Sequence, residues 1–407
     1  SLKVLSCSRY SKICNMKKFI LLSLLWGVLV GSVSIGNPQN PSLGQAPVPH
    51  RFGPSVTGFT LDVLKNLFNQ DAETQTQNML FSSSSLYKTM MMLYLGSSGA
   101  STQNIKEALH LENVGFDVTE DFKKWRGFKR PQVTEGARLF YQKSLQMKAN
   151  IKKLLGEDLY GISFERQSAV SDINNWATII MGRTETLVTA AGVRGQKLLP
   201  VSLARSKPIW NFTQQEFVTN KLDFYLNELE GDSFDAIEIL SKMKYYKSEE
   251  LGSTIFSIKY QQSQFTYLIF LPYQNHTMID LVDSLTVDKL NTAIKNLKEE
   301  RFVLRMPKFK LQKLIHLKGK CALLGMCEML KAKTQDLKGF TTDAGIHLSE
   351  FIQKVEFEVH AEDSLPKPTP QYGGVQIFTV NRPFVYMVYD HLSQMPVLAG
   401  TMMNPKQ

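Results

Sequence analysis

The sequence predicts one α+β domain behind a processed N-terminal region. Segments with apolar residues at helical spacing dominate its first half, and short runs with strand character dominate its second half, without regular alternation of the two. Residues 56–405 contain no linker-like change of composition and no internal repeat, so we expect them to fold as one unit. With 43% hydrophobic and 21% charged residues, the chain can bury a sizeable core.

The N-terminus has the layout of a secretory signal peptide. Residues 1–15 look like an upstream translated segment, and residues 16–36 combine two lysines, an apolar run and several small residues. We expect cleavage after Ser34 or Gly36 and a secreted, extracellular protein. An N-terminal membrane anchor is the disfavoured alternative, because the apolar run is short for a bilayer. The Pro- and Gly-rich residues 37–55 are expected to form a flexible leader.

Removal of the signal peptide and of the segment before it changes the charge and the cysteine count. Five basic residues and no acidic residue leave, so the formal charge falls from +10 to +5, which is not typical of proteins that bind nucleic acids. Cys7 and Cys14 leave with the same segment. Cys321 and Cys327 remain, and their spacing does not settle whether they form a disulfide.

Two N-glycosylation sequons agree with the expectation of secretion. They begin at Asn211 and Asn275, and each has Thr at its third position. We expect both asparagines to carry glycans on the surface of an exported glycoprotein.

The expected helices and strands follow from the spacing of apolar residues. Helices are expected at residues 59–70, 85–96, 101–111, 149–159, 168–182 and 287–297. Strands are expected at residues 133–142, 234–240, 242–248, 253–260, 265–273, 301–311, 354–359 and 383–390. The methionines Met90–Met92 are expected to fill the core and not to contact a cofactor.

No motif of a common enzyme class is present in the chain. It lacks the G-x-S-x-G, H-E-x-x-H, Walker and C-x-x-C patterns, and its seven histidines are dispersed without metal-ligand spacing. We therefore predict that the protein is not an enzyme, and we expect no cofactor and no metal.

One cluster of positive charge stands out between residues 123 and 130. Its cations surround Trp125 and Phe128, and they are Lys123, Lys124, Arg126, Lys129 and Arg130. Such a patch could hold a sulfated polysaccharide, because guanidinium groups pair well with sulfates. The favoured alternative is a solvated helix end or loop whose aromatic side chains are buried in the body of the protein.

The C-terminal third resembles the serpin family of serine protease inhibitors. Residues 340–359 are similar to the family segment that leads into the reactive-centre loop, and residues 381–405 are similar to its closing strands. Upstream, residues 78–111 are similar to the family's second to fourth helices. Shorter segments, such as residues 137–142, 173–177 and 249–260, follow in the family's order, so the resemblance covers essentially all of residues 56–405. It implies the serpin fold, which is a single α+β domain with three β-sheets and about nine helices, here over residues 56–407.

The resemblance also places a reactive-centre loop at residues 360–380. In inhibitory members this loop is a bait for a protease, which becomes trapped as an acyl complex while the cut loop inserts as a new central strand. Aligned from its C-terminal anchor, the reactive bond is Tyr372–Gly373, and aligned from its hinge it falls near Ile377. The two positions differ because this loop is shorter than is usual in the family. The implied partner is an extracellular serine protease, and Tyr372 suggests a chymotrypsin-like one.

The hinge of this loop departs from the inhibitory pattern. Ser364 keeps the pattern, but Asp363 stands where Gly is usual, and Pro366, Lys367 and Pro368 stand where alanines belong. A proline has no N–H to give to a sheet and is nearly excluded from central strands. Loop insertion is therefore disfavoured.

The segment beside the expected insertion site, residues 202–210, departs as well. Trp210 is kept, but Arg205, Ser206 and Pro208 replace aromatic residues and glycine. We predict a secreted, non-inhibitory member of the family, whose loop is a protease substrate or a static binding surface. The alternatives are an active inhibitor of an extracellular chymotrypsin-like serine endopeptidase, and a polyanion-binding or carrier protein. We expect a monomer without nucleic-acid or membrane partners.

Overall fold

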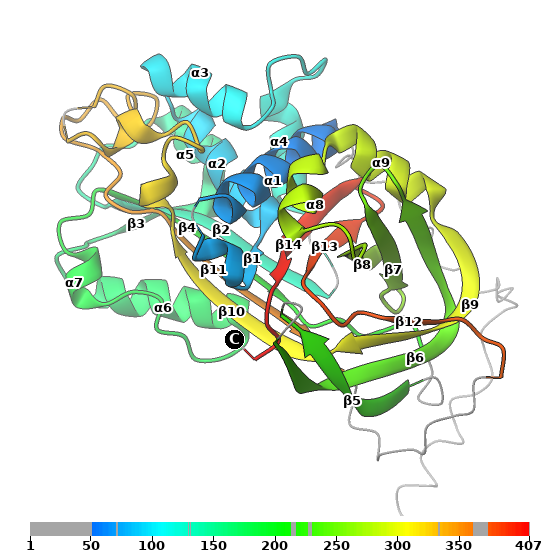
Figure 1. The fold of residues 1–407 in the computed structure, drawn as a ribbon. Coiled ribbons are helices and arrows are strands. Elements are labelled where there is room, and N and C mark those ends of the chain that lie inside the picture. The colour runs from blue at the N-terminus through cyan, green and yellow to red at the C-terminus, as the bar shows by residue number, and fades with distance from the viewer. Residues whose placement is uncertain are drawn as a thin grey trace, which may run out of the picture. The chain divides into compact units, whose positions relative to one another are not determined.

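The computed structural model describes residues 51–406 except 71, 129, 131, 213–216, 227–229, 333 and 361–372. Several predicted features lie outside the described residues: the upstream segment, the signal peptide, most of the leader, Lys129, Tyr372 and the hinge residues Asp363, Ser364, Pro366, Lys367 and Pro368. The described part of the chain forms nine α-helices and 14 β-strands within one compact unit (Figure 1). None of its helices has both the length and the apolar character needed to cross a membrane.

All six helices expected from the sequence are present. The helices are α1 (Gly53–Phe68), α2 (Ser83–Leu95), α3 (Gly99–Ala108), α4 (Val118–Arg126), α5 (Ala149–Leu155), α6 (Ser168–Met181), α7 (Ala190–Val193), α8 (Met278–Ser284) and α9 (Val287–Asn296). Helix α1 begins at Gly53, so the last residues of the expected leader are helical. Pro54 suits this start, because the first turn of a helix needs no N–H from it. Helices α4, α7 and α8 were not predicted, and α4 was interpreted only as a cluster of positive charge.

Five strands form a sheet in the order β10, β11, β4, β2, β3. Their bounds are β10 (Phe309–His316), β11 (Ile352–Val359), β4 (Leu198–Ser206), β2 (Val133–Gln142) and β3 (Leu159–Ile162). Within it, β4 and β11 are parallel neighbours, although they are far apart in the sequence.

The other strands form a nine-stranded sheet that divides at one long strand. They are β1 (Met79–Phe81), β5 (Phe217–Tyr225), β6 (Gly231–Ser248), β7 (Ser253–Lys259), β8 (Phe265–Pro272), β9 (Lys298–Pro307), β12 (Ile377–Thr379), β13 (Phe384–Asp390) and β14 (Met395–Met402). Strand β6 pairs with β5 and β9 along its first part and with β7 at its end. This division separates a part with β5, β9 and β12 from a part with β7, β8, β13, β14 and β1, which gives the three predicted sheets.

Helices α2 and α6 cover opposite faces of β4 (Figure 1). Leu199, Val201 and Leu203 of β4 belong to the core under α6, whereas Leu198 and Ala204 belong to the main core that contains α2. This alternation is the two-residue period of a strand that is buried on both faces. The methionines Met90–Met92 of α2 are almost fully buried, as expected for core residues.

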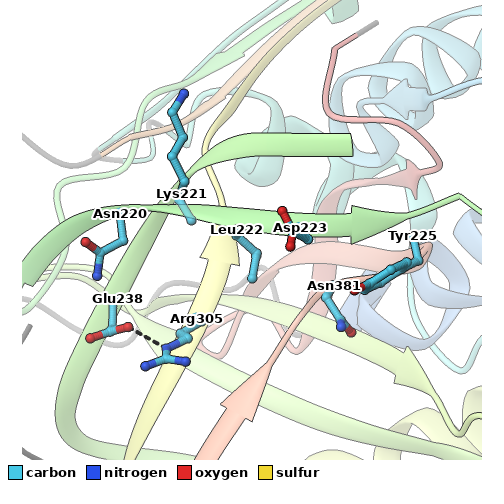
Figure 2. Close-up of a pocket in the computed structure, with 9 residues that line it drawn as sticks. Asn220, Lys221, Leu222, Asp223, Tyr225, Glu238, Arg305 and Asn381 are labelled. Atoms are coloured by element: carbon cyan, nitrogen blue, oxygen red, sulfur yellow. Dashed lines mark hydrogen bonds and ion pairs between the residues drawn. The ribbon is translucent and has the colours of Figure 1, made fainter. Parts of the chain in front are cut away.

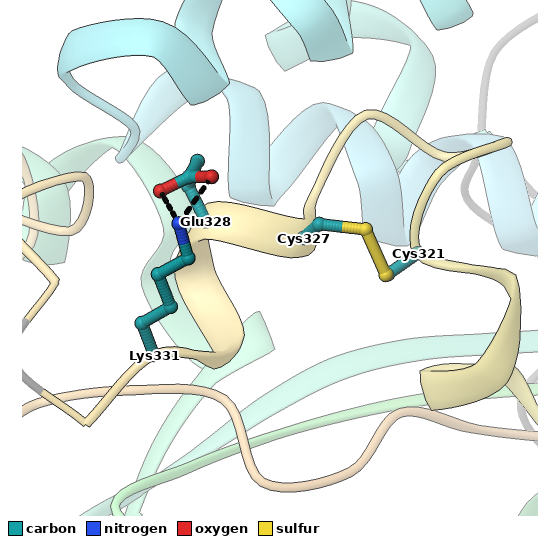
Figure 3. The surroundings of a disulfide bond; sticks show 4 residues. All are labelled: Cys321, Cys327, Glu328 and Lys331. Atoms are coloured by element: carbon teal, nitrogen blue, oxygen red, sulfur yellow. Dashed lines mark hydrogen bonds and ion pairs between the residues drawn. A yellow bond between two sulfur atoms is a disulfide. The ribbon is translucent and has the colours of Figure 1, made fainter.

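Cys321 and Cys327 form a disulfide, which the sequence had left open. Figure 3 shows the bond beside the ion pair of Glu328 and Lys331. The bond closes a short loop between β10 and β11 in the sequence.

Candidate functional site

The predicted reactive-centre loop is anchored by β11 on one side and β12 on the other. Strand β11 ends at Val359, and β12 pairs with β9 from Ile377 onward. Gly373, which follows the predicted reactive bond, lies in an exposed turn, and Tyr372 lies outside the described residues. Ile377, where the alternative alignment places the bond, is part of strand β12.

The boundary between β4 and β11, which we call the seam, is the place where an additional strand could enter. Val201–Ser206 of β4 lie beside Ile352–Phe357 of β11, and the two strands run parallel. A chain that leaves the end of β11 and turns back would run antiparallel to β11 and therefore also to β4. A strand in that orientation can bond to both neighbours, provided that the seam opens and each inserted residue supplies its N–H.

A buried polar cluster fixes the seam to the start of α2. Gln353 of β11 donates through Nε2 to the carbonyl of Ser82 at 3.0 Å and to Oγ of Ser202 at 2.9 Å. Its Oε1 accepts from the N–H of Ser82 at 3.2 Å, and Oγ of Ser85 lies 2.8 Å from Oγ of Ser202. These side chains are fully buried, so β11, β4 and α2 are held together by bonds that water cannot replace.

Two ion pairs cross the seam near its loop end. Arg205 of β4 lies directly opposite Glu356 of β11, with its Nε 3.8 Å from Oε1, and Lys207 lies 3.1 Å from Glu358. From the other side, Lys310 of β10 lies 3.3 Å from Glu356 and 3.4 Å from Glu358. Burial alone would raise the pKa of Glu358, but the bond to Lys207 and the charges of both lysines hold it below its usual value.

The same carboxylates connect the seam to the segment that follows α6. Arg183 lies 2.7 Å from Glu356 and 2.9 Å from Glu185, and Lys354 of β11 also pairs with Glu185. Arg205 donates to the carbonyl of Met181, the last residue of α6, at 2.9 Å. We call the set of charged residues at this end the seam cluster, and its members are Arg183, Glu185, Arg205, Lys207, Lys310, Lys354, Glu356 and Glu358. Arg205, a departure from the family pattern, thus has partners in this cluster that an uncharged residue could not pair with.

Trp210 ties the first residue of the loop to the core. Its indole Nε1 donates to the carbonyl of His360 at 2.6 Å, directly after β11 ends. The ring is buried and makes aromatic contacts with Tyr260 and Tyr267. The path of the chain as it leaves β11 is therefore set by a buried side chain.

The basic cluster does not form one surface patch. On α4, Lys123 and Lys124 pair with Glu120 and Asp121 of the same helix. Arg126 pairs with a carboxylate near β3 and also donates to a backbone carbonyl. Trp125 is buried, as the favoured alternative expected.

Arg130 is a correction to the predicted patch, because its side chain has no solvent exposure. It lies 2.9 Å from Glu135 of β2 and 3.1 Å from Asp390 of β13, and Lys88 of α2 lies 3.1 Å from the same Glu135. Two cations and two carboxylates thus form a buried quartet that links three elements. Burial lowers the pKa of Lys88, whereas for Glu135 the two cations outweigh burial and lower its pKa.

The C-terminal anchor of the loop borders a polar pocket of about 470 Å³ (Figure 2). After β12, the N–H of Val380 donates to the backbone carbonyl of Arg305 in β9, and the carbonyl of Asn381 accepts from the N–H of Tyr225, both at 2.8 Å. Arg305 also pairs with Glu238 of β6. The walls of this pocket carry charges of both signs, and Arg305 and Lys221 already pair with Glu238 and Asp235, so we assign no ligand to it.

Both predicted glycosylation sites, Asn211 and Asn275, are exposed. Asn211 follows Trp210 at the loop end of the seam, and Asn275 precedes α8. Their modification stays a prediction.

Comparisons with known proteins agree on one family. A sequence model described as "Serpin (serine protease inhibitor)" matches residues 54–405. The chain is 24% identical over 377 residues to the leukocyte elastase inhibitor of Xenopus tropicalis, with 86% of this chain and 98% of that protein covered. A crystal structure of maspin has a TM-score of 0.76 at 21% identity, with 88% of this chain and 100% of that one covered. Thyroxine-binding globulin in complex with thyroxine has a TM-score of 0.74 at 18% identity, with 87% and 99% covered.

Proposed function

The chain belongs to the serpin family, and we propose that it is a secreted member that does not trap proteases. Its loop would serve as a substrate that proteases cut, or as a static surface that a partner binds. The observation that carries this proposal is a mismatch between the sequence of the loop and the seam that would have to receive it.

The mismatch begins with missing hydrogen-bond donors in the loop. A strand inserted between β4 and β11 must donate its N–H groups to carbonyls of both neighbours. The loop has prolines at positions 366 and 368, in the part of the loop that would have to insert. Each proline would leave a buried carbonyl without its donor, at a cost of about 1–3 kcal/mol.

The seam itself adds a second obstacle. Insertion of one strand would move β11 away from β4 by about 4.8 Å, the spacing between neighbouring strands. The Arg205–Glu356 and Lys207–Glu358 pairs would then be separated, along with the direct backbone bonds between the two strands. The energy released by loop insertion would have to exceed these losses.

The experiment uses the purified mature protein with chymotrypsin and with elastase. We expect cleavage in the loop without a protease adduct on denaturing electrophoresis, and the same melting temperature before and after the cut. A band at the summed mass of protein and protease, or a large rise in melting temperature after cleavage, would refute the proposal.

Active inhibition of an extracellular chymotrypsin-like protease is the second candidate function. It is favoured by the name of one relative, an elastase inhibitor, and by the exposed turn at Gly373 next to the predicted Tyr372–Gly373 bond. The same experiment decides between the two functions, because only an inhibitor forms the adduct.

The proposal of secretion has its own support. The sequence carries a signal-peptide pattern, the asparagines of both sequons are exposed, and Cys321 and Cys327 are joined as is usual in an oxidising compartment. Expression in cultured animal cells should give a protein in the medium that begins after Ser34 or Gly36. Treatment with an N-glycosidase should lower its apparent mass, and retention of residues 16–36 inside the cells would contradict secretion.

A further inference from the structure

A pocket of about 790 Å³ lies where the ends of several elements meet. It shares no lining residue with the seam cluster, and none of its lining residues is acidic. Most of its wall is apolar, from the end of α1, the end of β5, the start of α8 and the chain around β13 and β14. These apolar residues are Phe68, Leu226, Pro272, Met278, Pro383 and Met403.

Two large apolar side chains are exposed at this pocket. Tyr225 has 47% and Ile279 has 42% of its surface exposed, although both line a concave site. Exposed apolar groups around a hollow are a feature of sites that bind apolar ligands, because the ligand removes them from water. The size of the pocket is in the usual range for small-molecule sites, about 300–1,000 Å³.

Arg382 gives this apolar pocket a fixed positive charge. Its Nε and one terminal nitrogen donate to the carbonyl of Pro272 at 3.0 and 2.6 Å, and its other terminal nitrogen donates to Asn381 at 3.3 Å. Among the described residues, no carboxylate lies within ion-pair distance of Arg382. A guanidinium has five N–H groups, so one remains on each terminal nitrogen. Burial also lowers the pKa of Arg382, as expected for a cation held partly away from water.

We propose that this pocket binds a single-chain fatty acid, with the carboxylate on Arg382 and the hydrocarbon chain along the apolar wall. The two remaining N–H groups lie on one guanidinium, which can pair with the two oxygens of a carboxylate. A neutral apolar ligand would leave this charge unpaired, and a cationic ligand would be repelled by it. The inference is independent of the loop, so it can hold whether or not the protein inhibits proteases.

The test is a fluorescence titration of the mature protein with dansyl-undecanoic acid, followed by displacement with oleate. We expect the dansyl emission to rise on binding and to fall again as oleate is added. Methyl oleate has the same chain without the charge, and it should displace the probe far less well. Lysophosphatidic acid, an anion with a larger headgroup, serves as a second competitor and should be weaker than oleate.

Two variants with matched controls locate the site. Arg382→Gln removes the charge and should weaken oleate binding by about tenfold or more, whereas Arg301→Gln removes an exposed arginine of β9 and should have no effect. Ile279→Glu puts a negative charge at the mouth of the pocket and should also weaken binding. Its control is Ile179→Glu, on the 75% exposed position of α6.

Three results would overturn the inference. They are no displacement of the probe by oleate, equal displacement by methyl oleate, and unchanged binding in both pocket variants. If Arg382→Gln does not fold, as judged by circular dichroism, Ile279→Glu decides alone, because that side chain is exposed and its replacement need not disturb the core.

Discussion

Arg205 of β4 lies directly opposite Glu356 of β11, and the same guanidinium donates to the carbonyl of Met181 at the end of α6. One side chain thus connects both edges of the seam with the helix that covers it. Glu356 is almost fully buried, so this carboxylate depends on its cations more than a surface carboxylate does. The seam cluster is therefore a structural reason for β4 and β11 to stay together.

Replacement Arg205→Gln should lower the free energy of unfolding by about 1 kcal/mol. The loss is modest, because Arg183 and Lys310 still pair with Glu356 and because Arg205 is partly exposed. Urea unfolding followed by intrinsic fluorescence measures it. Lys221→Gln is the control, since Lys221 forms a solvent-exposed pair with Asp235 and its loss should change little. Equal effects of the two variants would show that the seam pair adds no stability.

Replacement Gln353→Met should lower the free energy of unfolding by about 2–4 kcal/mol. Methionine has nearly the same length, so the loss reports the hydrogen bonds to Ser82 and Ser202 and not a cavity. The exposed Gln103→Met on α3 is the matched control and should lie within about 0.5 kcal/mol of the wild type. A small effect of Gln353→Met would mean that the buried cluster is not what fixes α2 to the seam.

Replacement Glu135→Gln should be the most destabilising of these changes, by about 3 kcal/mol or more at pH 7. It removes one of the two carboxylates of the buried quartet, so the positive charges of Lys88 and Arg130 lose half of the negative charge that compensates them. The exposed Glu120→Gln on α4 is the control, because its partner Lys123 stays in water. Urea unfolding of both variants at pH 7 makes the comparison.

The same variant gives a pH dependence with a defined sign. The pKa of Glu135 is lower in the folded protein than its ordinary value of 4.5, so its stabilisation is present above about pH 4.5. It is lost as the pH falls through the lower, folded-state pKa. The difference in unfolding free energy between wild type and Glu135→Gln should therefore shrink below pH 4.5. A difference that grows on acidification would mean that the pKa of Glu135 is raised in the folded protein.

Weak retention on heparin-agarose is the expected behaviour of the mature protein. Arg130 is buried, and Lys123, Lys124 and Arg126 already pair with carboxylates, so these four cations of the basic cluster are engaged within the protein. We expect elution at low salt, because dissolved ions screen the attraction between exposed protein charges and the sulfates of heparin. Elution only at high salt, lost in a Lys123→Gln and Lys124→Gln double variant, would instead support the polyanion-binding alternative.

The fold could be predicted because the spacing of apolar residues indicates most helices and strands locally, and because long segments of the sequence resemble those of the serpin family. Strand β2 begins and ends at the predicted residues, and the long apolar α2 was expected from its own sequence. Two expected strands proved to be one, β6, because Ser241 between them fits an extended strand as well as a break. Helix α8 was missed because its main signal is a capping box, in which the side chains of Thr277 and Asp280 each accept a hydrogen bond from the other residue's backbone N–H.

The polar contacts of the site could not be predicted, because they join residues from distant parts of the chain. Arg130 and Asp390 are separated by 260 positions, and nothing in a positive cluster shows that one of its members is buried. A weak signal did exist for the quartet, since Lys88 is the one charged residue of helix α2. The seam cluster left a similar signal at Arg205, which appears in the sequence only as a departure from the family pattern.

Repair of the hinge is the most direct test of why this serpin would not insert its loop. A variant with Asp363→Gly, Pro366→Ala, Lys367→Ala and Pro368→Ala restores the missing donors and the small side chains. After cleavage of the loop, its melting temperature should rise, whereas that of the cleaved wild type should not change. Addition of Arg205→Gln should make the melting temperature rise sooner after cleavage, because less of the seam cluster then opposes opening of the seam.

If the wild type shows the same rise in melting temperature as the repaired variant, the prolines do not block insertion. If the repaired variant shows no rise even with Arg205→Gln, the obstacle lies in neither the hinge nor the seam pair, and the reason would have to be sought in the buried cluster of Gln353 beneath them.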